Sequence, residues 1–194
     1  GLSMKLLSGI FTISIVWLMM SFFLGVNIYV ELITVFIGLS SFFYFKLYQE
    51  FWNFFSKNFI FFLPISFVII FAGSFFPFIL DHFGYYLPTI KWISEFGLVK
   101  GISNLDLLLG QMSVWHLFQA GFSHFSDPFL RINSIILIVY LIYIFEKKSW
   151  LHLAFSPILF LFSQSPSPDL PVIVFSLIIL NEILSGNKNV SFLF

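Results

Sequence analysis

The residues of this chain whose types could do chemistry gather in one long polar stretch that begins at Asp81. Asp81 directly follows a hydrophobic run, and the stretch continues past Tyr86 to Asp106. The Asp81 carboxylate is therefore expected at a membrane surface, in contact with water. There it can orient or deprotonate an incoming hydroxyl or amine whose co-substrate is held in lipid. Asp81 is our candidate catalytic residue, although a polar residue that only marks the end of a span would look the same.

Three further charged residues are candidates for substrate binding. Arg131 begins a hydrophobic segment, where its guanidinium can bind a lipid phosphate with two hydrogen bonds or simply reach the interface. Asp169 ends a loop stiffened by prolines, so it either caps the next helix or helps to bind a substrate amine or a phosphate-bridging metal. Asp106 follows a turn sequence and is typical of a helix start.

Composition excludes several classes of protein. Of the 194 residues, 59% are hydrophobic and only 9% are charged, whereas a soluble domain carries about 25% charged residues. The net charge is zero and no basic run exists, which argues against nucleic acid as a partner. There is no cysteine, and the four histidines show no metal-ligand spacing. The sequence therefore predicts no metal site and identifies no cofactor.

Hydrophobic segments dominate the chain and predict an all-α, polytopic transmembrane protein. A bilayer core requires about 20 apolar residues per helix, and backbone amides in hydrocarbon must be paired within a helix. We expect about six spans, with a tight turn at Val26 and Asn27 between the first two. These segments are Leu6–Gly25, Ile28–Phe45, Phe59–Ile79, Leu130–Phe145, Trp150–Phe162 and Leu170–Leu184. Glu31 and Glu182 lie in or near spans, and we expect each to reach its nearer interface.

The distribution of basic residues predicts the orientation. With Lys5 in the cytoplasm, most lysines fall on that side, namely Lys46, Lys57, Lys147, Lys148 and Lys188. Lys91, Lys100, Arg131 and all four aspartates fall on the outer side. The expected location is a bacterial inner membrane. We expect the chain to form one membrane domain, 1–194, which is either the N-terminal part of a longer protein or stands alone.

The outer loop, 81–127, is expected to contain two interfacial or re-entrant helices. Leu87–Phe96 places apolar residues on one face, has Pro88 in its first turn and ends before Gly97. A second helix is predicted from Leu105 to about Ala120. Asp127 and Pro128 are typical of the N-cap and first position of the following helix.

This outer loop resembles the first outer loop of GT-C glycosyltransferases. The resemblance is carried by Asp81, the run Gly84-Tyr85-Tyr86-Leu87-Pro88, the pair Trp92-Ile93 and the run from Val99 to Leu105. Three positions depart from the family pattern: Tyr86 stands in place of a histidine, Lys100 in place of a proline and Asp106 in place of a final histidine. Tyr86 is a further candidate for substrate binding. The match covers 81–122, and the loop that ends at Asp169 is similar to the second outer loop of that family.

The resemblance implies an enzyme that takes a sugar from a polyprenyl-phosphate carrier at the outer membrane face. It implies Asp81 as the acidic residue after an early span, beside two interfacial helices. The sequence-based hypothesis is therefore a glycosyltransferase-like protein whose partners are membrane lipid and a lipid-linked sugar donor. A non-catalytic subunit that packs against partner membrane subunits is the main alternative, and a transporter is the third.

Overall fold

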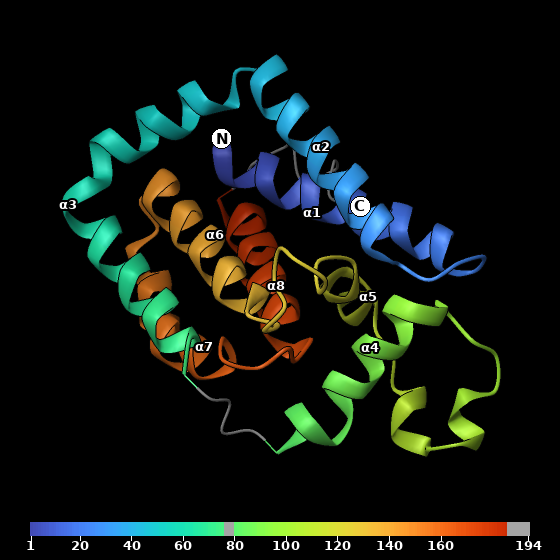
Figure 1. Cartoon of the computed structure of the whole chain (residues 1–194). Coiled ribbons are helices and arrows are strands. Elements are labelled where there is room, and N and C mark those ends of the chain that lie inside the picture. The colour runs from blue at the N-terminus through green and yellow to red at the C-terminus, as the bar shows by residue number, and fades with distance from the viewer. Residues whose placement is uncertain (76–79, 186–194) are drawn as a thin grey trace.

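The protein is all-α in the part of the chain that the structure, a computed structural model, describes, which is residues 1–75 and 80–185. The expected fold class is therefore confirmed at this level. Eight α-helices are joined by short 3₁₀ and π segments (Figure 1). The α-helices are α1 (Leu2–Ser21), α2 (Ile28–Tyr44), α3 (Leu47–Gly73), α4 (Leu87–Phe96), α5 (Val114–Gly121), α6 (Ile132–Lys147), α7 (Ser156–Phe162) and α8 (Asp169–Leu184).

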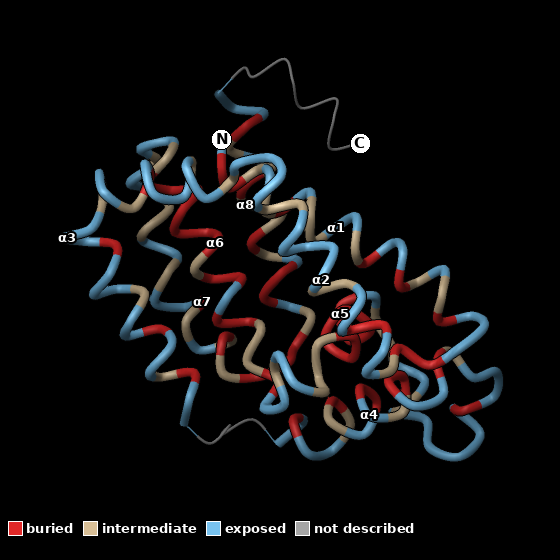
Figure 2. Tube along the Cα trace, turned by 45° about the horizontal axis from the view of Figure 1, so that its top comes forward, coloured by how far each residue is buried: buried red, intermediate tan, exposed pale blue. Residues whose placement is uncertain are grey.

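Helix α6 forms the centre of the bundle. Its side chains are buried along nearly its whole length, and α1, α3, α7 and α8 pack around it (Figures 1 and 2). A helix that is apolar on all sides is stable in this position because neighbours cover every face. On the other flank, α5 is buried from Trp115 to Gly121 between α1 and α4.

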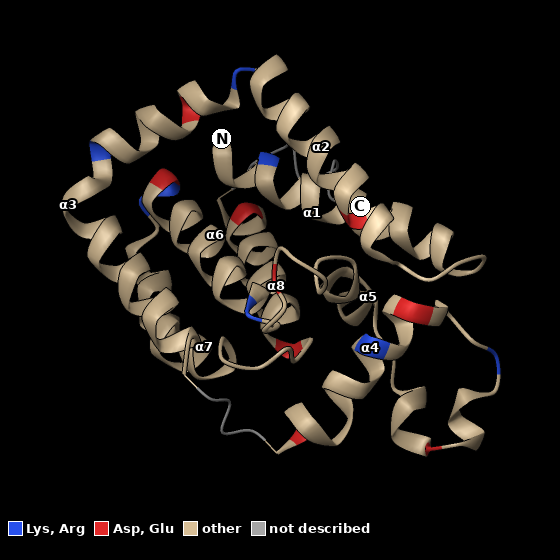
Figure 3. Ribbon diagram, in the orientation of Figure 1, with Lys and Arg blue, Asp and Glu red and all other residues tan. Residues whose placement is uncertain are grey.

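Charged side chains gather at the two ends of this bundle (Figure 3). At one end, here called the Lys5 end, Lys5 pairs with Glu50 at 2.5 Å and Lys147 pairs with Glu182 at 2.7 Å. There the Glu146 carboxylate also accepts hydrogen bonds from the first backbone N–H groups of α1. The opposite end, here called the Arg131 end, carries the residues Glu31, Asp81, Lys91, Glu95, Asp127, Arg131 and Asp169.

Exposed apolar residues, here called the apolar belt, lie mostly on α2 and α3, and Figure 2 shows that most positions of these two helices are exposed. Phe36 is 72% exposed and Ile60 is 76% exposed, and both stand among other exposed aromatic and aliphatic residues. Soluble monomers rarely expose continuous apolar surface of this size. An apolar belt between two charged ends is the surface that a bilayer would cover.

Fewer described helices are long enough to span a membrane than the six expected from the sequence. Only α1 and α3, with 20 and 27 residues, are long and apolar enough to cross a membrane among the described helices. Helices α2, α6 and α8 have 17, 16 and 16 residues, or about 24–26 Å at 1.5 Å per residue. The hydrocarbon core is about 30 Å thick, so these three fall short of it.

The fifth expected span, Trp150–Phe162, is not one α-helix. It is a 3₁₀ helix, Trp150–Phe155, followed by the seven residues of α7, with Pro157 in the first turn. Proline lacks the N–H that would continue the preceding turn, which explains the break. Other boundaries also differ: α3 begins at Leu47, twelve residues before the predicted start at Phe59, whereas 76–79 and Lys188 lie outside the described residues.

Two predictions about connections were wrong. The connection between α1 and α2 runs from Phe22 to Asn27, longer than the expected turn, and Asn27 caps α2 by accepting from the N–H groups of Tyr29 and Val30. The expected helix from Leu105 to Ala120 is instead a 3₁₀ turn, Leu107–Gly110, and α5. Ser113 begins α5 as a side-chain cap, which interrupts the longer helix.

Candidate functional site

Most of the predicted site residues converge at the Arg131 end of the bundle. Asp81 is exposed and directly precedes a π-helix, His82–Tyr86, which continues into α4. The predicted helix Leu87–Phe96 is confirmed with the same bounds. Pro88 in its first turn and Gly97, with a φ of +72°, at its end are the local signals that set those bounds.

Tyr85 lies within electrostatic range of both candidate carboxylates. Burial, the hydroxyl of Tyr86 and the nearby charges of Asp81 and Asp169 together raise the pKa of Tyr85. The phenol therefore stays protonated and is a hydrogen-bond donor beside two exposed carboxylates, Asp81 and Asp169, that are 88 positions apart in the chain. The resemblance pointed only to the second tyrosine, Tyr86, so Tyr85 was not predicted as a site residue.

Asp169 is the first residue of α8 and is not the N-cap. One carboxylate oxygen accepts a hydrogen bond of 2.7 Å from the Ser167 hydroxyl, which in turn accepts from the Asp169 N–H at 3.2 Å. This exchange fixes the carboxylate at the helix N-terminus, where the helix dipole favours negative charge.

Arg131 ties three elements together at this end. Its Nη1 donates to the Gln164 carbonyl at 2.9 Å, after α7, and its Nη2 donates to the Phe75 carbonyl at 2.8 Å, after α3. Burial and then the charge of Arg131 lower the pKa of His82. A guanidinium has five N–H donors, so three remain for a phosphate in addition to these two structural bonds.

Tyr86 is 5% exposed, and its ring lies 5.2 Å from that of His116 between centroids. The Ser113 N–H donates to His116 Nδ1 at 3.3 Å, while the Ser113 hydroxyl accepts from the His116 N–H. Because Nδ1 accepts, the proton of the neutral ring is on Nε2. Burial lowers the pKa of His116 to about 4, so the ring is uncharged at neutral pH.

Several polar side-chain atoms of the π-helix, α4 and α5 are buried without a hydrogen-bond partner. They are His82 Nδ1, Thr89 Oγ1, His116 Nε2 and Gln119 Oε1. Tyr86 contacts His116 of α5, and α4, which contains Thr89, packs against α5, to which Gln119 also belongs. Unpaired buried groups are rare because each costs about 1–3 kcal/mol, and they commonly mark functional positions.

Asp106 does not join this group. It is exposed and caps its own 3₁₀ turn, accepting from the Leu108 N–H at 2.9 Å. The structure therefore gives it the helix-start role that the sequence suggested, and its described hydrogen bond is local.

Two acidic residues, Asp127 and Glu31, make contacts that the sequence did not predict. Asp127 precedes α6 by several residues and is not at the N-cap position, which Arg131 occupies; its Oδ1 accepts from the Arg131 N–H at 2.8 Å. Glu31 lies at the Arg131 end but is fully buried within the protein. Its carboxylate accepts from three consecutive backbone N–H groups, those of His124, Phe125 and Ser126.

A hollow of about 240 Å³ lies on the other side of α4, between this helix and the segment 123–130. Lys91, Glu95 and His124 contribute its charged or titratable groups. In the described residues no group of three or more His, Asp or Glu side chains is placed to hold a metal ion. The Arg131 end offers carboxylates, phenols, imidazoles, the Lys91 ammonium and the Arg131 guanidinium.

Comparisons with known proteins place this chain in a family. The chain belongs to the family described as "Domain of unknown function (DUF8201)", whose model matches residues 1–194. No curated protein and no solved structure matches it.

Proposed function

We propose that this member of the DUF8201 family is a multi-pass membrane protein that transfers a sugar from a polyprenyl-phosphate donor. The Arg131 end would face outward, and the Lys5 end would face the cytoplasm. The observation that carries the proposal is that the charges of Asp81 and Asp169 both act on Tyr85, at the end of an apolar bundle that also holds Arg131. These residues come from three separate parts of the chain.

The reaction assigns a distinct role to each group. Asp81 would accept the proton of an acceptor hydroxyl as its oxygen forms a bond to the anomeric carbon. The bond between that carbon and the phosphate oxygen would break, and polyprenyl phosphate would leave with the electron pair. Arg131 would stabilise the phosphate charge with its remaining N–H groups. Asp169 and Tyr85 would orient sugar or acceptor hydroxyls.

Membrane insertion is the first part of the proposal, and α1 and α3 support it by length. The shorter helices α2, α6 and α8 would cross with their charged ends at the interfaces and with local thinning of the bilayer. Because the chain has no cysteine, single cysteines introduced as Asp106→Cys and Lys147→Cys report the topology directly. We expect a membrane-impermeant maleimide to label the first from outside in intact cells and the second only after lysis. Labelling of both from the same side would contradict this arrangement.

The catalytic part is tested by sugar transfer from polyprenyl-phosphate donors with the full-length protein in membranes. Loss of a general base typically costs 10²–10⁴-fold in rate, so we expect a decrease of that size in Asp81→Asn. The matched control is Asp106→Asn, an equally conservative change at an exposed aspartate that caps a distant turn and should retain activity. Equal rates in Asp81→Asn and wild type would remove Asp81 from the mechanism.

A non-catalytic membrane subunit is the second candidate function, and a different observation favours it. Helix α2 contacts the bundle mainly through α3 and α5 and leaves a long apolar face exposed. A neighbouring membrane helix could cover that face. Absence of transfer with every donor, together with co-purification of a partner membrane protein that is lost on substitution of Phe36 by Ser, would favour this reading.

A further inference from the structure

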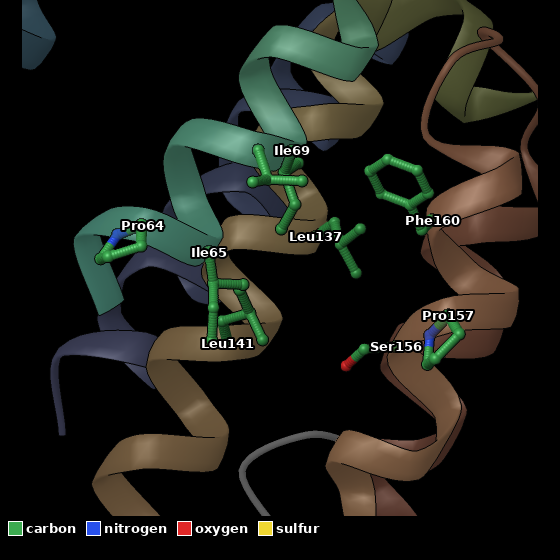
Figure 4. A pocket seen from close by; sticks show the side chains of 9 residues that line it. Pro64, Ile65, Ile69, Leu137, Leu141, Ser156, Pro157 and Phe160 are labelled. Atoms are coloured by element: carbon green, nitrogen blue, oxygen red, sulfur yellow. The ribbon is translucent and has the colours of Figure 1, made fainter. Parts of the chain in front are cut away.

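An apolar crevice opens on the side of the bundle between α3, α6 and α7 (Figure 4). Its volume is about 360 Å³. The wall consists of aliphatic and aromatic side chains and two prolines, and the Ser156 hydroxyl, which is buried without a partner, is the polar side chain in it. The apolar residues of the wall include Ile65, Val68, Ile69, Leu137, Leu141 and Phe160.

Prolines lie on both sides of this crevice. Pro64 is inside α3, where its missing N–H leaves the Ile60 carbonyl without its helical partner and its ring crowds the same carbonyl. Pro157 begins α7 after a 3₁₀ turn. Both prolines border the crevice, and the facing residues Leu137 and Leu141 of α6 form the floor between them (Figure 4).

The size of the crevice restricts what can occupy it. A helix of three turns, about 10 Å wide and 16 Å long, fills roughly 1,250 Å³, which is far more than the crevice offers. At roughly 30 Å³ for a group of the size of water or a methylene, the crevice holds about a dozen chain carbons. That is a segment of one hydrocarbon chain, and the crevice opens within the apolar belt where such chains would lie.

Arg131 stands at the outer end of this crevice. The crevice is lined by α3, α6 and α7, and the guanidinium bonds to the carbonyls that follow α3 and α7 while its own residue precedes α6. Leu137 is six positions after Arg131, which is about 9 Å along a helix. A lipid whose chain lies in the crevice would therefore have its headgroup near the cation.

We infer that the crevice holds the single hydrocarbon chain of a polyprenyl phosphate, with its phosphate at Arg131. This inference rests on the proposed function and adds the place where the donor lipid is held. A single-chain lipid is favoured over a two-chain phospholipid because the volume accepts one chain, and a phosphate is favoured because a cation lies at the outer end.

The experiment measures lipid binding by the purified full-length protein, without any transfer reaction, using a long-chain polyprenyl phosphate and phosphatidylglycerol as separate probes. The test variant is Ile65→Trp, which fills the crevice from a half-exposed position and should not disturb the core. The matched control is Phe61→Trp, one turn earlier on α3 and 70% exposed. Arg131→Gln, read alongside them, removes the cation.

We expect Ile65→Trp to weaken binding of polyprenyl phosphate at least tenfold and Phe61→Trp to change it less than twofold. Val68→Trp provides a second filling variant if the first does not fold. Binding of polyprenyl phosphate that is equal to wild type in both filling variants would overturn the inference. Tighter binding of phosphatidylglycerol than of polyprenyl phosphate would also overturn it. Normal binding of polyprenyl phosphate without sugar transfer would overturn the proposed function but not the lipid site in the crevice. Sugar transfer that is unaffected by Ile65→Trp would overturn the lipid site but not the proposed function.

Discussion

The Glu31 carboxylate accepts a hydrogen bond of 2.8 Å from the backbone N–H of Ser126, although the two residues are 95 positions apart. Two further N–H groups, of His124 and Phe125, donate to the same carboxylate at 3.0 and 3.3 Å. The His124 ring nitrogen Nδ1 lies 3.3 Å from it, without hydrogen-bond geometry. Glu31 therefore joins the first turn of α2 to the loop that leads into α6, and it accounts for a charge buried at the Arg131 end.

Replacing this carboxylate should destabilise the protein. In Glu31→Gln one side-chain oxygen is replaced by an NH₂ group, which cannot accept from the backbone donors. We expect a loss of about 1–3 kcal/mol, the cost of leaving a buried donor unpaired. Thermal unfolding in detergent measures it, with Glu95→Gln, at an exposed glutamate of α4, as the control. An unchanged Tm in Glu31→Gln would mean that the loop finds other acceptors.

Gly121 allows α5 to approach α1. A Cβ at this position would lie 2.0 Å from a ring carbon of Trp17, which is 1% exposed and packs against the rings of Phe118 and Phe122. Overpacking of this kind costs about 1–3 kcal/mol, so we expect Gly121→Ala to lower the Tm.

The control for that variant is Gly38→Ala, because a Cβ at Gly38 would meet no atom within 4 Å. Alanine has the higher helix propensity, by about 1 kcal/mol, so this variant should be neutral or slightly stabilised. Equal Tm values in the two variants would contradict the close packing of Trp17.

Local sequence signals predicted local structure well. The bounds of α4 agree with Pro88 and Gly97. The alternation of basic residues along the chain predicted that charged residues lie at the two ends of the bundle. The grouping of Asp81, Asp169 and Arg131 could also be anticipated, since each follows or precedes a hydrophobic segment on the same predicted side.

Long-range contacts account for what the sequence did not predict. The partners of Glu31 are backbone N–H groups of a distant loop, which leave no mark on residue type. The break before α5 depends on the reciprocal capping of Ser113 and His116, in which histidine takes the place usually held by Glu or Gln. Likewise, the fifth segment is apolar enough for a span, but Pro157 and the 3₁₀ turn divide it.

Asn133 connects α5, α6 and the loop before α8. Its side-chain oxygen accepts from Trp115 Nε1 at 2.7 Å, and its NH₂ group donates to the carbonyls of Ser165 and Ser167 at 2.6 and 2.8 Å. Asn133→Asp keeps the shape but sets an oxygen against two carbonyl oxygens. We expect a loss above about 2 kcal/mol, measured as a lower Tm. Asn53→Asp, on the exposed face of α3, controls for the added charge. A similar Tm in the two variants would show that the hydrogen bonds of Asn133 do not stabilise the fold.

Asp127 and His116 should give opposite pH dependences of stability in the same range. Burial raises the pKa of Asp127 from 3.8 to about 6, so its contribution is present below pH 4 and is lost as the pH rises through 6. Burial lowers the pKa of His116 from 6.5 to about 4, so its contribution is present above pH 6.5 and is lost as the pH falls through 4.

Single variants separate the two contributions. Asp127→Asn keeps an oxygen that can accept from the Arg131 N–H, and its Tm relative to wild type should rise as the pH increases from 4 to 6. His116→Asn should show the reverse, with its Tm relative to wild type highest near pH 4. The measurement is the Tm of the three proteins at intervals between pH 4 and 7 in one detergent. Parallel Tm curves would contradict the burial of both groups, because a solvent-exposed carboxyl or imidazole has nearly the same pKa in the folded and unfolded states and adds no slope.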